Sequence, residues 1–207
     1  MSRELATDRV IHGIGICLGI VGAIVLIWMT AIGGGPKDLA PILIYAAGLL
    51  AMLGCSAAYN VFRTSGRREW LRRFDHAAIF AMIAGTYTPF TTRLSSGWAS
   101  GLTAVIWVVA VAGIALKLWQ PRRIEAISIA LYLTLGWIGL AAAGPFMTAL
   151  DSQTLVLLAL GGSIYTAGVV FHLWHRLPYQ NAIWHGFVLV AAMIHYAAVL
   201  TVLPASA

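Results

Sequence analysis

Charged residues are scarce in this 207-residue chain, at 10% of the sequence against 60% hydrophobic residues. Soluble domains carry about 25% charged residues, so the composition excludes an ordinary soluble domain and is typical of an integral membrane protein. Among the charged residues the acidic ones are fewer: the chain has seven Asp and Glu and thirteen Lys and Arg, which gives a formal net charge of +6. Because the arginines lie in short loops between apolar runs, they indicate the orientation of membrane spans and not a nucleic-acid partner.

Cysteine is also rare, since only Cys17 and Cys55 occur and both lie within apolar runs. We predict that both are buried free thiols, because such placement is typical of packed cysteines. A cleavable signal peptide is not expected, although Arg3 and Arg9 precede an apolar run. That run, at 10–32, is longer than a signal core and has no clear small-residue cleavage site after it. It is predicted to be the first membrane span.

Long apolar runs are abundant. A helix needs about 20 apolar residues to cross the hydrocarbon core, and seven segments qualify: 11–32, 40–62, 75–93, 98–117, 126–147, 154–174 and 182–203. No linker or internal repeat separates them, so residues 1–207 are predicted to form one all-α domain, a polytopic seven-helix transmembrane bundle. Gly144-Pro145 is predicted to end or kink the fifth helix.

The Lys and Arg residues are divided unequally between the two sides of such a bundle. With a cytoplasmic N-terminus and alternating spans, the opposite side holds only Lys37 and Arg93. The cytoplasmic segments hold the other eleven: Arg3, Arg9, Arg63, Arg67, Arg68, Arg72, Arg73, Lys117, Arg122, Arg123 and Arg176. Since cytoplasmic loops carry an excess of Lys and Arg, the N-terminus is predicted to be cytoplasmic and the C-terminus outside.

Polar side chains within the predicted spans gather near the cytoplasmic side. Six of them lie at the ends of the second, third and seventh helices: Ser56, Asn60, Asp75, His76, Asn181 and His185. Residues four apart share a helix face, which places Ser56 with Asn60 and Asn181 with His185. Ionisable groups at this depth are costly in lipid and mark a functional site by default.

Structural roles remain open for these residues. Asp75 can cap its helix N-terminus, and Ser56 can bond to a carbonyl one turn back. The asparagines can link helices through hydrogen bonds. Two further histidines extend the candidate polar pocket: His12 near the start of the first helix, and His195, about 21 Å deeper than Asn181. A buried imidazole needs a partner, but a backbone carbonyl would suffice.

Several motifs resemble the signature of bacterial hemolysin III proteins. They are Asp75-His76-Ala77-Ala78-Ile79, Ala84-Gly85-Thr86-Tyr87-Thr88-Pro89-Phe90, and Tyr179-Gln180-Asn181-Ala182-Ile183-Trp184-His185-Gly186-Phe187-Val188. His195 matches the family's closing histidine, and Glu4 and His12 fit its opening segment. This family belongs with the progestin and adiponectin receptors, in a superfamily that includes alkaline ceramidases. The resemblance spans nearly the whole chain and implies seven helices, an inside N-terminus and the bacterial inner (cytoplasmic) membrane.

The resemblance also implies a zinc site near the cytoplasmic face. Its ligands are one histidine of a Ser-x-x-x-His motif in the second helix and two of a His-x-x-x-His motif in the seventh. An aspartate in the third helix holds or activates the metal-bound water. In this sequence the serine is Ser56, the aspartate is Asp75, and the last ligand is His185.

This chain departs from that pattern at two of the three ligand positions. Asn60 occupies the position of the second-helix histidine, and Asn181 occupies the position of the first histidine of the seventh helix. A neutral amide oxygen is a weak ligand for zinc, which prefers imidazole, thiolate and carboxylate. We therefore expect a metal site that is absent, or weak and held by His185, Asp75 and His76.

Three functions remain open, each with membrane lipids as partners. In a metal-dependent intramembrane lipid hydrolase, Asp75 would accept a proton from water while Ser56 orients the attacked group. His76 or His185 would complete an acid–base pair with Asp75. Alternatively, a non-enzymatic, receptor-like lipid sensor would regulate membrane fluidity or lipid composition. A pore-forming cytolysin is disfavoured, because a pore needs a polar path and the polar residues cluster at one end.

Overall fold

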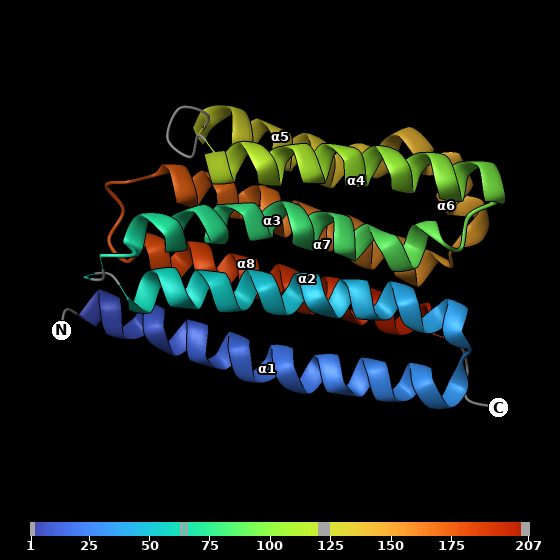
Figure 1. The fold of residues 1–207 in the computed structure, drawn as a ribbon, viewed down its shortest axis with the longest axis horizontal. Helices are drawn as coiled ribbons and strands as arrows, with labels where there is room; N and C mark the ends of the chain where they lie inside the picture. The colour runs from blue at the N-terminus through green and yellow to red at the C-terminus, as the bar shows by residue number, and fades with distance from the viewer. Residues whose placement is uncertain (1–2, 63, 65, 120–124, 204–207) are drawn as a thin grey trace.

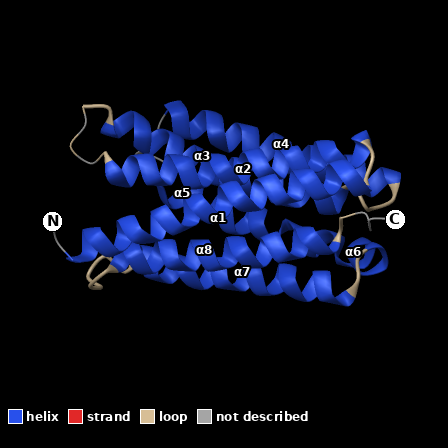
Figure 2. Ribbon diagram, turned by 90° about the horizontal axis from the view of Figure 1, so that it is seen from below, coloured by secondary structure: helices blue, strands red, loops and turns tan. Residues whose placement is uncertain are grey.

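The computed structural model describes residues 3–62, 64, 66–119 and 125–203, and within these residues the secondary structure is entirely helical. Seven helical segments run side by side along the bundle (Figures 1 and 2). Six are single helices: α1 (Arg3–Gly33), α2 (Pro36–Val61), α3 (Arg68–Thr91), α4 (Ser96–Trp119), α7 (Ser152–Leu173) and α8 (Gln180–Thr201). The remaining segment joins α5 (Glu125–Trp137), a 3₁₀ turn η1 (Ile138–Ala142) and α6 (Ala143–Ala149).

The prediction of a seven-helix, all-α fold is confirmed, with different helix ends. The largest differences are at α1, which begins at residue 3 and not 11, and at α3, which begins at residue 68 and not 75. Counting apolar residues finds the part of a helix that lies in hydrocarbon. The backbone hydrogen bonds continue past that part, so a helix does not end where polar residues begin.

Six of the seven segments are long and apolar enough to cross a membrane, and the chain is a multi-pass membrane protein. The exception is α3, which carries Arg72, Arg73, Asp75 and His76 as well as several threonines. This helix packs between α2 and α4 (Figure 1) and has eleven buried residues. Polar residues are tolerated in a membrane helix when they face the bundle interior, which explains how α3 can sit there.

α2 and α3 approach each other closely at a pair of glycines. A Cβ at Gly48 would lie 3.0 Å from the carbonyl oxygen of Ala81, and a Cβ at Gly85 would lie 3.2 Å from that of Ile44. Residues without a side chain let helix backbones approach in this way. Gly85 belongs to the motif that ends at Phe90, so this glycine of the motif has a packing role.

The predicted interruption of the fifth segment is present, but it lies upstream of Gly144-Pro145, in the 3₁₀ turn. The Tyr87 hydroxyl of α3 donates to the carbonyl of Gly136 at 2.6 Å and accepts from the amide of Gly139 at 3.1 Å. Backbone groups freed by a helix break need such partners in a membrane protein. Tyr87 therefore completes the hydrogen bonding of this break.

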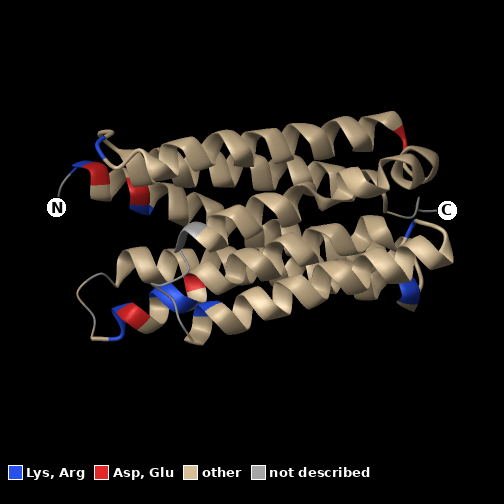
Figure 3. Ribbon diagram, turned by 90° about the horizontal axis from the view of Figure 1, so that it is seen from above, with Lys and Arg blue, Asp and Glu red and all other residues tan. Residues whose placement is uncertain are grey.

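The two cysteines are free, as predicted, but neither is fully buried: Cys17 is exposed on the surface of the bundle and Cys55 is only partly buried. An apolar run does not distinguish the lipid-facing side of a helix from the side that faces protein. Charged residues gather at the end of the bundle where α1 begins (Figure 3). We call this the basic end; among the described residues it carries Arg3, Arg9, Arg67, Arg68, Arg72, Arg73, Lys117 and Arg176.

Candidate functional site

A cavity of about 740 Å³ lies inside the bundle and follows α3 from Arg68 to Phe90. At 1.5 Å per residue, this stretch of helix is about 33 Å long, close to the thickness of the hydrocarbon core. At the basic end the cavity is lined by the polar residues His12, Ser56, Asn60, Asp75, His76, Asn181 and His185. Deeper in the bundle, residues such as Ile79, Leu158 and Val188 make its wall mainly apolar.

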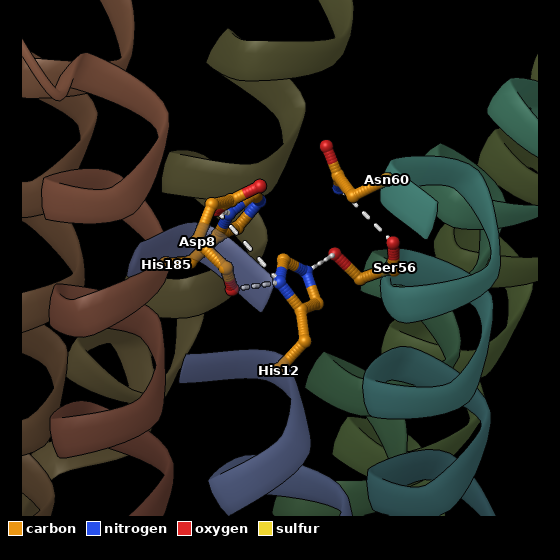
Figure 4. Close-up of polar contacts among 5 residues, drawn as sticks. All are labelled: Asp8, His12, Ser56, Asn60 and His185. Carbon is orange, nitrogen blue, oxygen red and sulfur yellow. Dashed lines mark hydrogen bonds and ion pairs between the residues drawn. The ribbon is translucent and has the colours of Figure 1, made fainter. Parts of the chain in front are cut away.

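The first and last helices meet at a buried carboxylate near the basic end (Figure 4). Asp8 Oδ1 of α1 lies 2.6 Å from His185 Nδ1 of α8. Asp8 is only 1% exposed, and a carboxylate buried in this way requires hydrogen-bond partners. A carboxylate can only accept, so the Nδ1 of His185 donates, and this bond orients the imidazole ring. His185 lines the cavity, whereas Asp8 lies behind it.

His12 occupies the next turn of α1 and connects this pair to α2. Its Nδ1 lies 2.8 Å from the backbone carbonyl oxygen of Asp8 and 3.8 Å from Asp8 Oδ1. Its Nε2 lies 3.2 Å from the Ser56 hydroxyl (Figure 4). The His12 and His185 rings meet edge to face, with centroids 4.3 Å apart. Asp75 of α3 lines the same cavity as Ser56 and His185.

The structure thus brings Ser56, Asp75, His12 and His185 together, as the polar layer suggested. Asn60 is buried, and its Nδ2 donates to the Ser56 carbonyl at 3.0 Å; this bond lies within α2, whereas the open alternative was a bond between helices. His76 and Asn181 line the same cavity.

His195 lies apart from this group, deeper in the same cavity. Its Nε2 is 3.3 Å from the carbonyl oxygen of Leu158, and its ring is tilted by 34° against that of Tyr165, with centroids 5.6 Å apart. The backbone carbonyl expected as a sufficient partner is therefore the one observed.

Asp8 is the member of the group that sequence reasoning missed. It precedes Arg9 and lies before the predicted first span, 11–32, so it was not among the polar residues counted within the spans. The overlooked signal was spacing, because Glu4, Asp8 and His12 recur every four residues and so share one face of α1.

Comparison with known proteins places this arrangement in a family. A family model described as "Haemolysin-III related" matches residues 6–196, a range that includes Asp8, His12, Ser56, Asp75 and His185. The chain belongs to the Haemolysin-III related family.

Relatives in this family come from bacteria and from animals. Hemolysin-3 of Bacillus cereus is 34% identical over 206 residues, which cover 98% of this chain and 93% of that protein. The Hemolysin-3 homolog of Bacillus subtilis (strain 168) is 32% identical over 188 residues, with 90% and 88% covered. The monocyte to macrophage differentiation factor of Homo sapiens is 30% identical over 165 residues, with 75% and 67% covered. The bacterial relatives suggest the cytoplasmic membrane as the location.

A metal could be held in this Haemolysin-III related protein by a different set of residues from the one that the resemblance implies. Among the described residues, Asp8, His12 and His185 offer ligand atoms that all lie within 4.8 Å of one another. One carboxylate and two imidazoles fit the ligand preferences of zinc, unlike Asn60 and Asn181. Asp8 and His12 of α1 could therefore supply the two ligands that Asn60 and Asn181 do not.

Proposed function

We propose that this protein binds an amphipathic membrane lipid in its cavity and hydrolyses an ester or amide bond at the lipid's polar end. Such a reaction would serve membrane-lipid homeostasis. The observation that carries the proposal is the cavity itself, which has acid–base groups at the basic end and mainly apolar walls beyond Ile79. An acyl chain would lie along α3 toward Phe90, and its carbonyl would lie near Ser56 and Asp75.

The cations of the cavity favour an anionic lipid headgroup. Arg68, Arg72 and Lys117 line the basic end, and Lys117 is 0% exposed. A buried ammonium group is costly at membrane depth, and such groups commonly mark ligand sites. We further propose that the basic end faces the cytoplasm, because positive residues concentrate on that side of membrane proteins. The lipid would then come from the inner leaflet.

The residues at the polar end supply the groups that hydrolysis requires. Asp75 and His185 can accept and return protons, and the Ser56 hydroxyl contacts the reacting end of the lipid. Asp8 holds the His185 ring in place through the 2.6 Å contact. A zinc ion, which the family resemblance implies, would be held by Asp8, His12 and His185 and would supply Lewis acidity and an activated water.

The test is product release from defined lipids by the purified protein in nanodiscs. Mass spectrometry would measure free fatty acid from a phospholipid ester and from an N-acyl amide lipid, for wild type and Asp75→Asn. The matched control is Asp38→Asn, which changes a carboxylate at the opposite end of the bundle, beside Arg93. We expect release from at least one lipid, reduced in Asp75→Asn and retained in Asp38→Asn. Lipid that co-purifies but is never cleaved would overturn hydrolysis.

That last result would support the second candidate, a non-enzymatic lipid sensor. The observation that favours a sensor is that Asn60 and Asn181, two amides, line the cavity at the positions where the family resemblance implies zinc-binding histidines. A pore remains the weakest proposal, because the cavity wall beyond the polar end is mainly apolar.

A further inference from the structure

The hydrogen bonds of His12 determine which ring nitrogen carries a proton. The backbone carbonyl of Asp8, 2.8 Å from Nδ1, can only accept, so Nδ1 carries the hydrogen. In a neutral imidazole the other nitrogen then has a free lone pair. Nε2 of His12 therefore accepts the hydrogen bond from Ser56, 3.2 Å away. This is the arrangement of a serine whose proton is directed at a base.

Burial keeps this arrangement in place. His12 is 8% exposed and Asp8 is 1% exposed, so the ring has little freedom to turn away. The Asp8 carboxylate, 3.8 Å from Nδ1, would stabilise the positive charge of the ring after it takes a proton. Ser56 and His12 both line the cavity, so a lipid carbonyl in that cavity can reach the serine.

We propose that Ser56 is a nucleophile and His12 its general base, so that the lipid acyl group passes through a covalent ester with Ser56. The proposal rests on the proposed function and names its reaction type, acyl transfer. In this reaction the lone pair of His12 Nε2 accepts the Ser56 proton. A metal bound to the same nitrogen would occupy that lone pair, so metal binding there and activation of Ser56 exclude each other.

The reaction has two balanced steps. First, Ser56 Oγ bonds to the lipid carbonyl carbon as its proton moves to Nε2 of His12. The bond to the lipid alcohol or amine then breaks, and that leaving group takes the proton from His12. Second, water attacks the acyl-serine as His12 accepts its proton, and the fatty acid leaves as Ser56 regains a hydrogen. Asn60, one turn along α2 and in the cavity wall, is a candidate donor to the transient oxyanion.

Asp75 is a competing base, because it lines the same cavity as Ser56 and a carboxylate can accept a proton. The two assignments differ in what each substitution removes. If His12 is the base, His12→Gln abolishes activation of Ser56, whereas Asp75→Asn only weakens it. If Asp75 is the base, the order of the two effects is reversed.

The experiment is covalent labelling with a fluorophosphonate that carries a long alkyl chain, on detergent-purified full-length protein with and without a chelator. Peptide mass spectrometry would identify the modified residue. We expect modification of Ser56 in wild type and no loss on chelation. The rate would fall about 10²-fold or more in His12→Gln, the range for loss of a general base. Ser163→Ala is the matched control: Ser163 is another helix serine, bonded to the carbonyl of Ala159, and its loss should not change labelling.

Three labelling results would each overturn the proposal: no label on Ser56, a label lost on chelation, or a label lost in Asp75→Asn but not in His12→Gln. If the His12→Gln protein still binds the lipids of the release assay, it is folded, and its loss of labelling is not caused by misfolding. Fatty-acid release that persists in Ser56→Ala would overturn this proposal and leave hydrolysis intact. A label on Ser56 without release from either lipid would support the nucleophile and overturn the proposed hydrolysis.

Discussion

The contact between Asp8 and His185 joins the first helix to the last, and its strength can be tested with Asp8→Asn. The substitution keeps the shape of the side chain and an oxygen that can accept, but removes the negative charge. In the native protein this oxygen lies 2.6 Å from His185 Nδ1, with Asp8 1% exposed. The change therefore converts a buried hydrogen bond to a carboxylate into a bond between neutral groups.

The expected cost follows from that conversion. Hydrogen bonds to charged groups contribute about 1.5–3 kcal/mol and neutral ones about 0.5–1.5 kcal/mol, so Asp8→Asn should destabilise by about 1–1.5 kcal/mol. For a chain of this size that corresponds to a fall in Tm of roughly 2–6 °C. The matched control is Glu4→Gln, one turn earlier on α1, which makes the same change of charge at an exposed site and keeps an oxygen that can accept the Tyr179 amide 3.1 Å away. It should alter stability by about 0.5 kcal/mol or less.

A double-mutant cycle measured by thermal unfolding in detergent isolates the contact. Asp8→Asn, His185→Gln and the double variant should show a coupling energy of about 1 kcal/mol, because each single change removes the same interaction. Additive effects would refute this account of the contact. A loss in Glu4→Gln equal to that in Asp8→Asn would show that the net charge of α1, and not the contact, sets the stability.

Four further predictions concern other parts of the molecule. Zinc at about 100 times its Kd should stabilise the wild type by about 2.7 kcal/mol, measured as a rise in Tm, and this rise should be mostly lost in Asp8→Asn. An equal rise in both proteins would exclude Asp8 as a ligand. Tyr87→Phe should cost about 1–3 kcal/mol in thermal unfolding, since two backbone groups at the α5 break lose their partner, and an unchanged Tm would contradict that role. Gly48→Ala should lower the free energy of unfolding by about 1–3 kcal/mol, because its Cβ would lie 3.0 Å from a carbonyl oxygen of α3. Gly101→Ala, which has open space around it, should be neutral or slightly stabilising in the same assay. The pKa of Asp151 is lowered by a hydrogen bond from the backbone amide of Thr154, which it caps at the start of α7. Its contribution to stability is therefore complete above its ordinary pKa of 3.8 and is lost as the pH falls through the lowered value. The Tm difference between wild type and Asp151→Ala should shrink only in that acid range.

Much of the fold could be predicted because membrane helices follow from apolar length. Seven runs predicted seven helical segments, including one interrupted near Gly144-Pro145. The residues that bracket the interruption could not be predicted, because they depend on Tyr87 of another helix reaching Gly136 and Gly139. A tertiary contact of this kind leaves no periodicity in the sequence.

The candidate site was partly predictable for a similar reason. Ser56, Asp75 and His185 were identified from their depth and their spacing, and all three line the cavity. Asp8 was not, because a charge just before the first apolar run resembles a solvated helix end. Its importance depends on the rotation of α1 against α8, which the sequence of either helix alone does not reveal.

The polar character of α3 has a consequence for how this protein enters the bilayer. Helices insert from the translocation machinery according to their hydrophobicity, and charged residues carry a large penalty. α3 is the segment that falls short of the hydropathy its neighbours reach, yet it lies between two that are strongly apolar. We therefore expect α3 to stay within the translocation machinery until α2 and α4 can shield it from lipid, so that these three helices enter the bilayer together. The same residues that equip the cavity for chemistry would then make biogenesis of the bundle cooperative.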